Sequence, residues 1–258
     1  MTIRNGKTHL FLPDVQNKPG LNTDHLSWAG QYVADKKPDV VICAGDFWDM
    51  PSLSSYDKGK LGFEGRRYSK DVESGNLAME RFLEPIRAMG KAKPRLVFTL
   101  GNHEQRIERA VSSTPELEGA IGYKDLNLSD WEVYDFLDIC RIDGVAYSHF
   151  FPRSSNGRIT QSRSGAPSAK AQLVREGASC TSGHAQGLDI APVCLNGKLQ
   201  WGIIAGSYYL HDEGYLTPQG TKYWRGLIVK HSVKAGEYCP IPVDINYLKQ
   251  RYGKKATK

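Results

Sequence analysis

Five short apolar segments of this chain each stop at residue types that bind metal ions, and this pattern constrains the fold more than any other feature. The residues that follow them are Asp14 and Gln16; Asp46 and Asp49 in Gly-Asp-Phe-Trp-Asp; Asn102 and His103 in Gly-Asn-His-Glu; His149; and His184 and Gln186 in Gly-His-Ala-Gln. Strands of an α/β sheet bind ligands at their carboxyl ends. The five segments are therefore predicted to be strands that meet at one shared site.

The first half of the chain alternates predicted strands with predicted helices. Residues 9–12, 40–44 and 95–100 are apolar enough to be strands, and the continuous run at 40–44 is typical of a buried one. A helix capped by Asn22 or Thr23 is predicted to run through Trp28 to Ala34. A second helix covers residues 71–89, with these side chains predicted to face inward: Leu77, Met79, Phe82, Leu83 and Ile86.

The second half is richer in strands and tight turns. Asp143-Gly144 and Asn196-Gly197 each separate two apolar runs and predict hairpins. Residues 223–233 and 238–245 are predicted to form a final strand pair, and residues 168–175 a helix. Two long polar excursions, 51–70 and 153–168, carry several arginines, and loops of this length in a compact domain are often functional.

No shift in composition marks a boundary within the chain of 258 residues. A single domain is therefore predicted over residues 1–248, followed by a basic, disordered tail at 249–258. The formal net charge of +6 fits a polyanionic partner such as nucleic acid or a nucleotide. The tail contributes Arg251, Lys254, Lys255 and Lys258, so the charge alone does not establish a binding surface.

The five cysteines are odd in number and form no Cys-x-x-Cys pair, which argues against a disulfide framework and against a zinc–thiolate site. Cys43, Cys140 and Cys180 lie in apolar runs and are predicted to be core residues. Neither a signal peptide nor a run long enough to span a membrane is evident, so a cytoplasmic location is expected.

The residue types at the strand ends suit the hydrolysis of phosphoesters. This reaction needs charge neutralisation on the phosphate and a hydroxide at neutral pH, and a pair of metal ions supplies both. A carboxylate can bridge two cations, while histidine nitrogen and amide oxygen fill the remaining coordination positions. The pattern therefore fits a dinuclear metal site.

The order of these motifs resembles that of the calcineurin-like metallophosphoesterases, whose pattern is Asp-x-His, Gly-Asp-x-x-Asp, Gly-Asn-His-Glu/Asp, a lone His, and Gly-His-x-His. The match runs from Asp14 to Gln186, about two thirds of the chain. The resemblance implies an α/β (α+β) fold with four layers in the order αββα, in which two facing mixed sheets are flanked by helices. The short elements are similar to phage or bacterial members, which places the expected location in a host cytoplasm if a phage encodes the chain.

The resemblance also implies a role for each matched residue. Asp46 would bridge two divalent metal ions. His103 would stand beside the leaving group as a general acid or phosphate stabiliser, and Asp49 would orient it from behind. The other ligands would divide between the two metals: Asp14, Gln16 and Gln186 at the first, and Asn102, His149 and His184 at the second.

Both histidines that belong only to the first metal in the family are glutamines here, Gln16 and Gln186. A neutral amide oxygen is a weaker ligand than imidazole, and an oxygen-only site favours Mn²⁺, Mg²⁺ or Ca²⁺ over Zn²⁺. Two divalent ions are expected, Mn²⁺ foremost, with Mg²⁺, Zn²⁺, Fe or Ni as alternatives. The first position is expected to bind weakly and to fill only at high metal concentration or with substrate.

Three functions fit these residues. The first is a phosphodiesterase or nuclease, because a positive groove suits a long anionic substrate; Arg106 and Arg153, close to the motifs, are the expected substrate contacts. The second is a protein or small-molecule phosphomonoesterase. Protein phosphatases usually have arginine directly after Gly-Asp-x-x-Asp and Gly-Asn-His-Glu, whereas Met50 and Gln105 stand there in this chain. The third is a metal-dependent binding protein without catalysis. The sequence does not indicate an oligomeric state.

Overall fold

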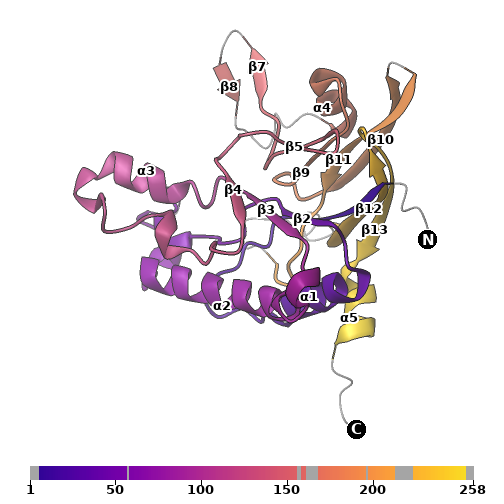
Figure 1. Ribbon diagram of the computed structural model, residues 1–258. Helices are drawn as coiled ribbons and strands as arrows, with labels where there is room; N and C mark the ends of the chain where they lie inside the picture. The colour runs from indigo at the N-terminus through magenta and orange to yellow at the C-terminus, as the bar shows by residue number, and fades with distance from the viewer. Residues whose placement is uncertain are drawn as a thin grey trace.

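The computed structural model describes residues 6–56, 58–155, 158–160, 168–195, 197–212 and 223–253, and side chains within 153–160 are outside this description. Helices α1 (Asp24–Lys36) and α2 (Tyr68–Arg87) cover one side of a six-stranded sheet. A five-stranded sheet faces the other side of that sheet, and α4 (Ala169–Glu176) covers it from outside (Figure 1). The expected four-layer αββα sandwich is confirmed.

The six-stranded sheet carries the first three motif strands at its centre. Its order is β13 (Glu237–Asp244), β12 (Gly226–Lys234), β1 (Lys7–Leu12), β2 (Val40–Cys43), β3 (Arg95–Thr99) and β4 (Glu132–Tyr134). Strands β1 to β4 are parallel, and β12 is antiparallel to β1. The carboxyl ends of β1, β2 and β3 therefore lie side by side at one edge.

The five-stranded sheet supplies the other two motif strands. Its order is β10 (Leu188–Leu195), β11 (Lys198–Ala205), β9 (Cys180–Ser182), β6 (Val145–Tyr147) and β5 (Cys140–Ile142). Strands β6 and β9 are parallel neighbours, so His149 and His184 leave this sheet at the same end. The two predicted hairpins are confirmed as β5–β6 and β10–β11, and the predicted final pair as β12–β13.

Alternation along the central strands divides the apolar side chains between two layers. Phe11 and Ile42 point between the sheets, whereas Leu10 and Leu12 face α1 and α2. The predicted core cysteines Cys43, Cys140 and Cys180 are buried, as expected. On α2 the inward prediction holds for Met79, Phe82, Leu83 and Ile86.

The prediction that Leu77 faces inward is wrong, because its side chain is 62% exposed. Each helical residue turns by about 100°, so Leu77 stands about 200° from Met79 and therefore on the opposite face of α2. Leucine is a good helix former, which accounts for its presence at a surface position of this helix. The core stripe of α2 is consequently narrower than the sequence suggests.

The C-terminal prediction also needs correction. Helix α5 (Ile245–Tyr252) continues four residues beyond the expected domain end at 248. The Asp244 carboxylate caps it by accepting from the Asn246 N–H at 2.7 Å, Leu248 is buried, and the Tyr252 hydroxyl donates to Asp35 over 2.7 Å. These contacts anchor residues 249–252, and residues 254–258 lie outside the described part of the chain.

The two polar excursions differ in structure. Residues 51–67 form two short 3₁₀ turns, Pro51–Leu53 and Leu61–Phe63, before α2 begins. Within 153–168, β7 (Arg153–Ser155) and β8 (Arg158–Thr160) pair as a separate hairpin that stands away from the five-stranded sheet (Figure 1). Among the helices of the described residues, none combines the length and apolar character that crossing a membrane requires.

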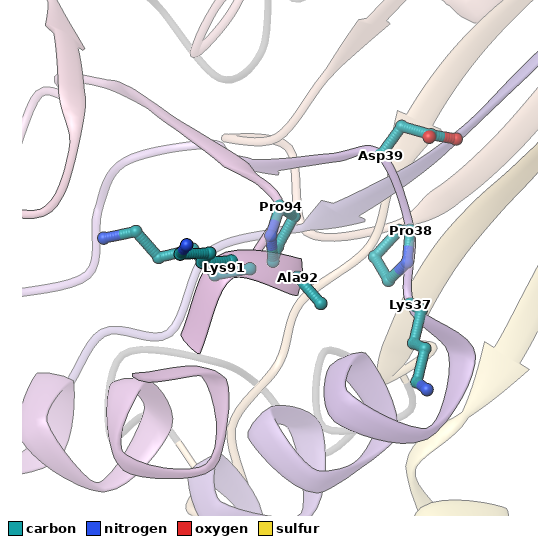
Figure 2. A pocket seen from close by; sticks show the side chains of 7 residues that line it. Lys37, Pro38, Asp39, Lys91, Ala92 and Pro94 are labelled. Carbon is teal, nitrogen blue, oxygen red and sulfur yellow. The ribbon is translucent and has the colours of Figure 1, made fainter. Parts of the chain in front are cut away.

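A shallow hollow of about 320 Å³ lies at the edge of the six-stranded sheet where β2 and β3 begin, opposite the motif residues. It is lined by Lys37, Pro38, Asp39, Lys91, Ala92, Lys93 and Pro94. Figure 2 shows that the side chains of Lys37 and Asp39 do not converge on it. The hollow therefore lacks the convergent polar groups that a ligand site needs.

One lysine is fully buried between the two sheets. Lys230 on β12 donates from Nζ to the Thr181 hydroxyl over 2.6 Å, and this nitrogen lies 4.1 Å from the centre of the Tyr147 ring and 5.0 Å from that of Tyr238. Burial lowers the pKa of Lys230 well below its ordinary value. The amine therefore favours its neutral form within the sandwich.

We expect Lys230→Met to raise the free energy of unfolding at pH 7 by about 1–2 kcal/mol, because an uncharged side chain replaces a buried amine. In wild type burial lowers the pKa of the folded amine, so the folded chain binds this proton less tightly than the unfolded chain, whose lysine pKa is about 10.4. Wild-type stability should therefore rise with pH toward that value, and the advantage of the variant should shrink. Melting curves of both proteins between pH 7 and 10 test this, and parallel curves would contradict it.

Candidate metal centre

The residues predicted for the second metal ion come together in a buried cluster. The ligand atoms of Asp46, His149 and His184 lie within 4.8 Å of one another. His149 Nε2 is 2.9 Å from Asn102 Oδ1, 3.2 Å from His184 Nδ1 and 3.4 Å from Asp46 Oδ2. Four residues from the ends of β2, β3, β6 and β9 thus converge on one point.

The chemistry of these atoms fits a bound cation. His149 Nδ1 lies 2.7 Å from the Ala44 carbonyl oxygen, which can only accept, so Nδ1 carries a hydrogen, and the ring in its neutral form would turn the Nε2 lone pair to the cluster. Asn102 Oδ1 and Asp46 Oδ2 also present lone pairs there. Such atoms repel one another unless a cation or a proton lies among them.

The pKa shifts of these residues, which arise from the protein alone, also indicate that positive charge is favoured among them. Burial would lower the pKa of His149, but the Asp46 carboxylate overrides it and raises the value to about 9. Burial likewise opposes ionisation of Asp46, yet His103 and His149 hold the pKa of that carboxyl below its usual range. Asp46 Oδ2 has no hydrogen-bond donor among the described residues, while Oδ1 accepts from the His103 N–H at 2.8 Å.

The residues predicted for the first metal ion lie beside this cluster and are fully buried. Asp14 Oδ1 accepts the His184 N–H at 2.8 Å, and a Cβ at Gly183 would come within 2.3 Å of the same oxygen. The Gln16 N–H donates to the Asp46 carbonyl over 2.7 Å, and Gln186 Oε1 accepts from the Tyr209 hydroxyl at 3.1 Å. The carboxylate and amide oxygens of this set suit a hard cation.

Four of the site residues adopt a left-handed backbone conformation that side chains rarely accept. The φ angles are 47° at Gln16, 47° at Asp46, 63° at His184 and 60° at Gln186. Such conformations cost about 1 kcal/mol or more each and cluster at functional sites. Their coincidence at the strand ends indicates that the surrounding structure fixes these side chains in place.

His103 and Asp49 form a pair at the mouth of the cluster. His103 Nδ1 donates toward Asp49, with Oδ1 at 2.7 Å and the carbonyl oxygen at 2.9 Å. Burial would raise the pKa of Asp49, but His103, Arg106 and Lys18 lower it to about 2. Burial would lower the pKa of His103, and the Asp46 carboxylate raises it. Nε2 of His103 is left 3.7 Å from Asp46 Oδ2, beside the cluster.

Arg106, predicted as a substrate contact, already binds the protein. Its Nη1 donates to the carbonyl oxygens of Asp49 at 2.7 Å and Met50 at 3.2 Å, and its Nη2 lies 3.3 Å from His103 Nε2. The guanidinium therefore braces the Asp49–Met50 turn beside His103. The side chain of Arg153, the other predicted contact, lies outside the described residues.

Sequence reasoning missed two charged residues at this site. Lys18 Nζ lies 3.6 Å from Asp49 Oδ2 with the side chain 26% exposed, which adds a reachable cation near His103. Glu104 is fully buried and accepts four backbone N–H groups, those of Asp46, Phe47, Trp48 and Gly101, at 2.7–3.1 Å. Glu104 is the last residue of the Gly-Asn-His-Glu motif, which marks it as a candidate. Its role as an anchor of the Asp46 turn is evident only from the folded structure.

Two aromatic residues pack close to the residues of the site. Trp48, which lies within the Gly-Asp-Phe-Trp-Asp segment, is fully buried, and its Nε1 donates to Asn76 over 3.2 Å. A Cβ at Gly75 would come within 1.8 Å of the indole ring, so the absence of a side chain on α2 makes room for Trp48. His25 is buried against the Tyr208 ring.

A family profile and two phage proteins match this chain in sequence. The profile of the calcineurin-like phosphoesterases matches residues 9–169, more than half of the chain. The Gene 54 protein of Mycobacterium phage L5 is 28% identical over 182 residues, 68% of this chain and 69% of the phage protein. The Gene 54 protein of Mycobacterium phage D29 is 29% identical over 163 residues, 62% of each chain. A crystal structure with 10% identity superposes on 93% of this chain and 99% of its own with a TM-score of 0.43. The chain belongs to the calcineurin-like phosphoesterase family, whose members are hydrolases that act on phosphoester bonds.

Proposed function

We propose that this chain is a divalent-metal-dependent phosphodiesterase or nuclease that acts on nucleic acid or nucleotides. The observation that carries the proposal is the buried cluster of Asp46, Asn102, His149 and His184 beside His103. The family generally binds two divalent metal ions. We assign Mn²⁺ foremost to this chain, held tightly at the cluster and weakly at Asp14, Gln16 and Gln186.

In this proposal the metal ions, when bound, neutralise charge on the phosphate and supply a hydroxide at neutral pH. Protonated His103 gives a proton from Nε2 to the leaving oxygen, since Nδ1 is engaged with Asp49. The ionised Asp49 fixes the ring and stabilises its charged form, and Arg106 braces the turn that carries Asp49. Lys18 and Arg153 are the cations that we assign to the substrate.

The choice of a diester rests on charge. The chain carries a formal net charge of +6, and Lys18 adds a partly exposed cation at the site. Positive charge near the site favours binding of an extended anionic substrate and makes the affinity for this substrate depend on salt concentration. We place this hydrolysis of nucleic acid or nucleotides in the cytoplasm of a host cell. Phosphomonoester hydrolysis and metal-dependent binding without turnover are the other outcomes of the test.

We expect the Mn²⁺-loaded protein to hydrolyse bis-p-nitrophenyl phosphate in preference to p-nitrophenyl phosphate, by about tenfold or more in kcat/KM. A screen of both substrates against Mn²⁺, Mg²⁺, Zn²⁺, Fe²⁺ and Ni²⁺ measures this preference. Faster monoester hydrolysis would move the assignment to a phosphatase. No turnover with any metal, together with ligand binding that survives His103→Ala, would leave a binding protein.

A further inference from the structure

The segment that follows β11 supports the residues of the first metal position directly. Ser207 forms a bridge with Asp14, and the Tyr208 N–H donates to the Asp14 carbonyl over 2.7 Å. The next residue, Tyr209, donates from its hydroxyl to Gln186 Oε1 over 3.1 Å. Tyr209 is 1% exposed and Gln186 is fully buried, so this hydrogen bond forms away from water. The segment therefore touches two of the three residues assigned to that metal.

The ring of Tyr209 is itself held by two neighbours. His211 stacks on it with ring centres 4.6 Å apart and planes inclined by 29°, and the guanidinium carbon of Arg225 lies 5.1 Å from the ring centre. Arg225 is fixed in turn by the carbonyl oxygens of Leu210 and His211 and by the Asp212 carboxylate. This packing leaves the hydroxyl of Tyr209 little freedom to move.

A glutamine needs such a partner more than the histidine that the family has at this position. Its side chain has more rotatable bonds than histidine, and its oxygen is a weak ligand that gains little from a single cation. Gln186 Nε2 has no hydrogen-bond partner among the described residues, so the bond to Tyr209 is the directional constraint that the structure gives this amide. A carbonyl oxygen has two lone pairs, so Oε1 can accept from Tyr209 and still bind a cation.

We propose that Tyr209 is a positioning residue for Gln186 and thereby sets the affinity of the first metal position. The inference rests on the proposed two-metal hydrolase and deepens it by explaining how an amide serves in place of imidazole. Removing an outer partner of a metal ligand typically costs about 10–100-fold in metal affinity. The loss should be larger for the weaker metal, because the Tyr209 hydroxyl donates to Gln186, which is assigned to that position.

The test is a Mn²⁺ titration of the full chain, following free Mn²⁺ by its electron paramagnetic resonance signal. Tyr209→Phe should bind the tighter Mn²⁺ as wild type does and the weaker Mn²⁺ about tenfold less tightly. The matched control is Tyr208→Phe, since Tyr208 is equally buried but its hydroxyl donates to the His25 carbonyl at 2.8 Å. This control should lower the melting temperature and leave both Mn²⁺ affinities unchanged.

Three results with the variants would overturn the proposal: a wild-type isotherm for Tyr209→Phe, equal weakening of both metal affinities in Tyr209→Phe, or the same loss in Tyr208→Phe. A wild-type protein that saturates at one Mn²⁺ per chain up to millimolar concentration would also overturn it, because no weaker position would exist. The titration needs no turnover. An inactive wild type that binds two Mn²⁺ ions would therefore contradict the proposed hydrolysis without touching the role of Tyr209.

Discussion

Asp46→Asn should lower metal-dependent hydrolysis by about a thousandfold or more while leaving the fold intact. The carboxylate lies among the residues of the site: Oδ1 accepts from the His103 N–H, and Oδ2 faces His149 and His103 at 3.4 and 3.7 Å. An amide of the same shape removes the negative charge that would bridge two cations, and a loss of several kcal/mol in transition-state stabilisation corresponds to this factor. The measurement is kcat/KM for bis-p-nitrophenyl phosphate at saturating Mn²⁺.

The control for this substitution is Asp138→Asn, which makes the same chemical change at an exposed position. It should retain wild-type activity and wild-type Mn²⁺ binding. Melting curves of both variants exclude loss of structure as the cause. Residual activity of Asp46→Asn within about tenfold of wild type would show that Asp46 does not hold the catalytic metal ions.

The second large effect is on stability rather than on chemistry. We expect Glu104→Ala to lower the free energy of unfolding by about 3–5 kcal/mol, because it leaves buried N–H groups without their acceptor and opens a cavity. For a chain of this size such a loss corresponds to a fall of about 10 °C in melting temperature. Mn²⁺ affinity should fall as well, since the lost acceptor anchors the turn that carries Asp46.

Glu104→Gln separates the charge from the shape. The amide keeps the size of the side chain but offers one oxygen to N–H groups that share two oxygens in wild type. The free energy of unfolding of this variant should therefore lie between those of wild type and Glu104→Ala. Glu116→Ala, at an exposed position, should change the melting temperature little. If Glu104→Ala melted like Glu116→Ala, the carboxylate could not be the anchor of the turn.

The sequence predicted the motif strands and their meeting point because both follow from local patterns, whereas the four layers followed from the resemblance to a known family. Apolar runs that end in Asp, Asn or His identify strand ends, and parallel strands bring those ends to one edge, which is where Asp46, Asn102, His149 and His184 meet. Of these four residues, Asp46 and His184 adopt left-handed backbone angles, which no local pattern in the sequence predicts. Local periodicity was less reliable for Leu77, since a helix face is decided by what packs against it.

The residues that sequence reasoning missed depend on contacts between distant parts of the chain. Lys18 reaches Asp49, and Tyr209 reaches Gln186 from beyond a whole hairpin. Neither residue belongs to a motif, and a lysine or tyrosine outside a motif is usually a surface or packing residue. The tail boundary moved for the same reason, because Tyr252 is anchored by Asp35 on α1.

The proposed hydrolysis requires a divalent cation at the point where four residues converge: Asp46, Asn102, His149 and His184. The most direct measurement is a crystal structure of the protein grown or soaked with Mn²⁺, with anomalous diffraction recorded at the manganese edge. We expect a strong anomalous peak roughly 2–2.5 Å from Asp46 Oδ2 and His149 Nε2, with a weaker second peak beside Asp14. A map at saturating Mn²⁺ with no peak next to Asp46 would contradict it.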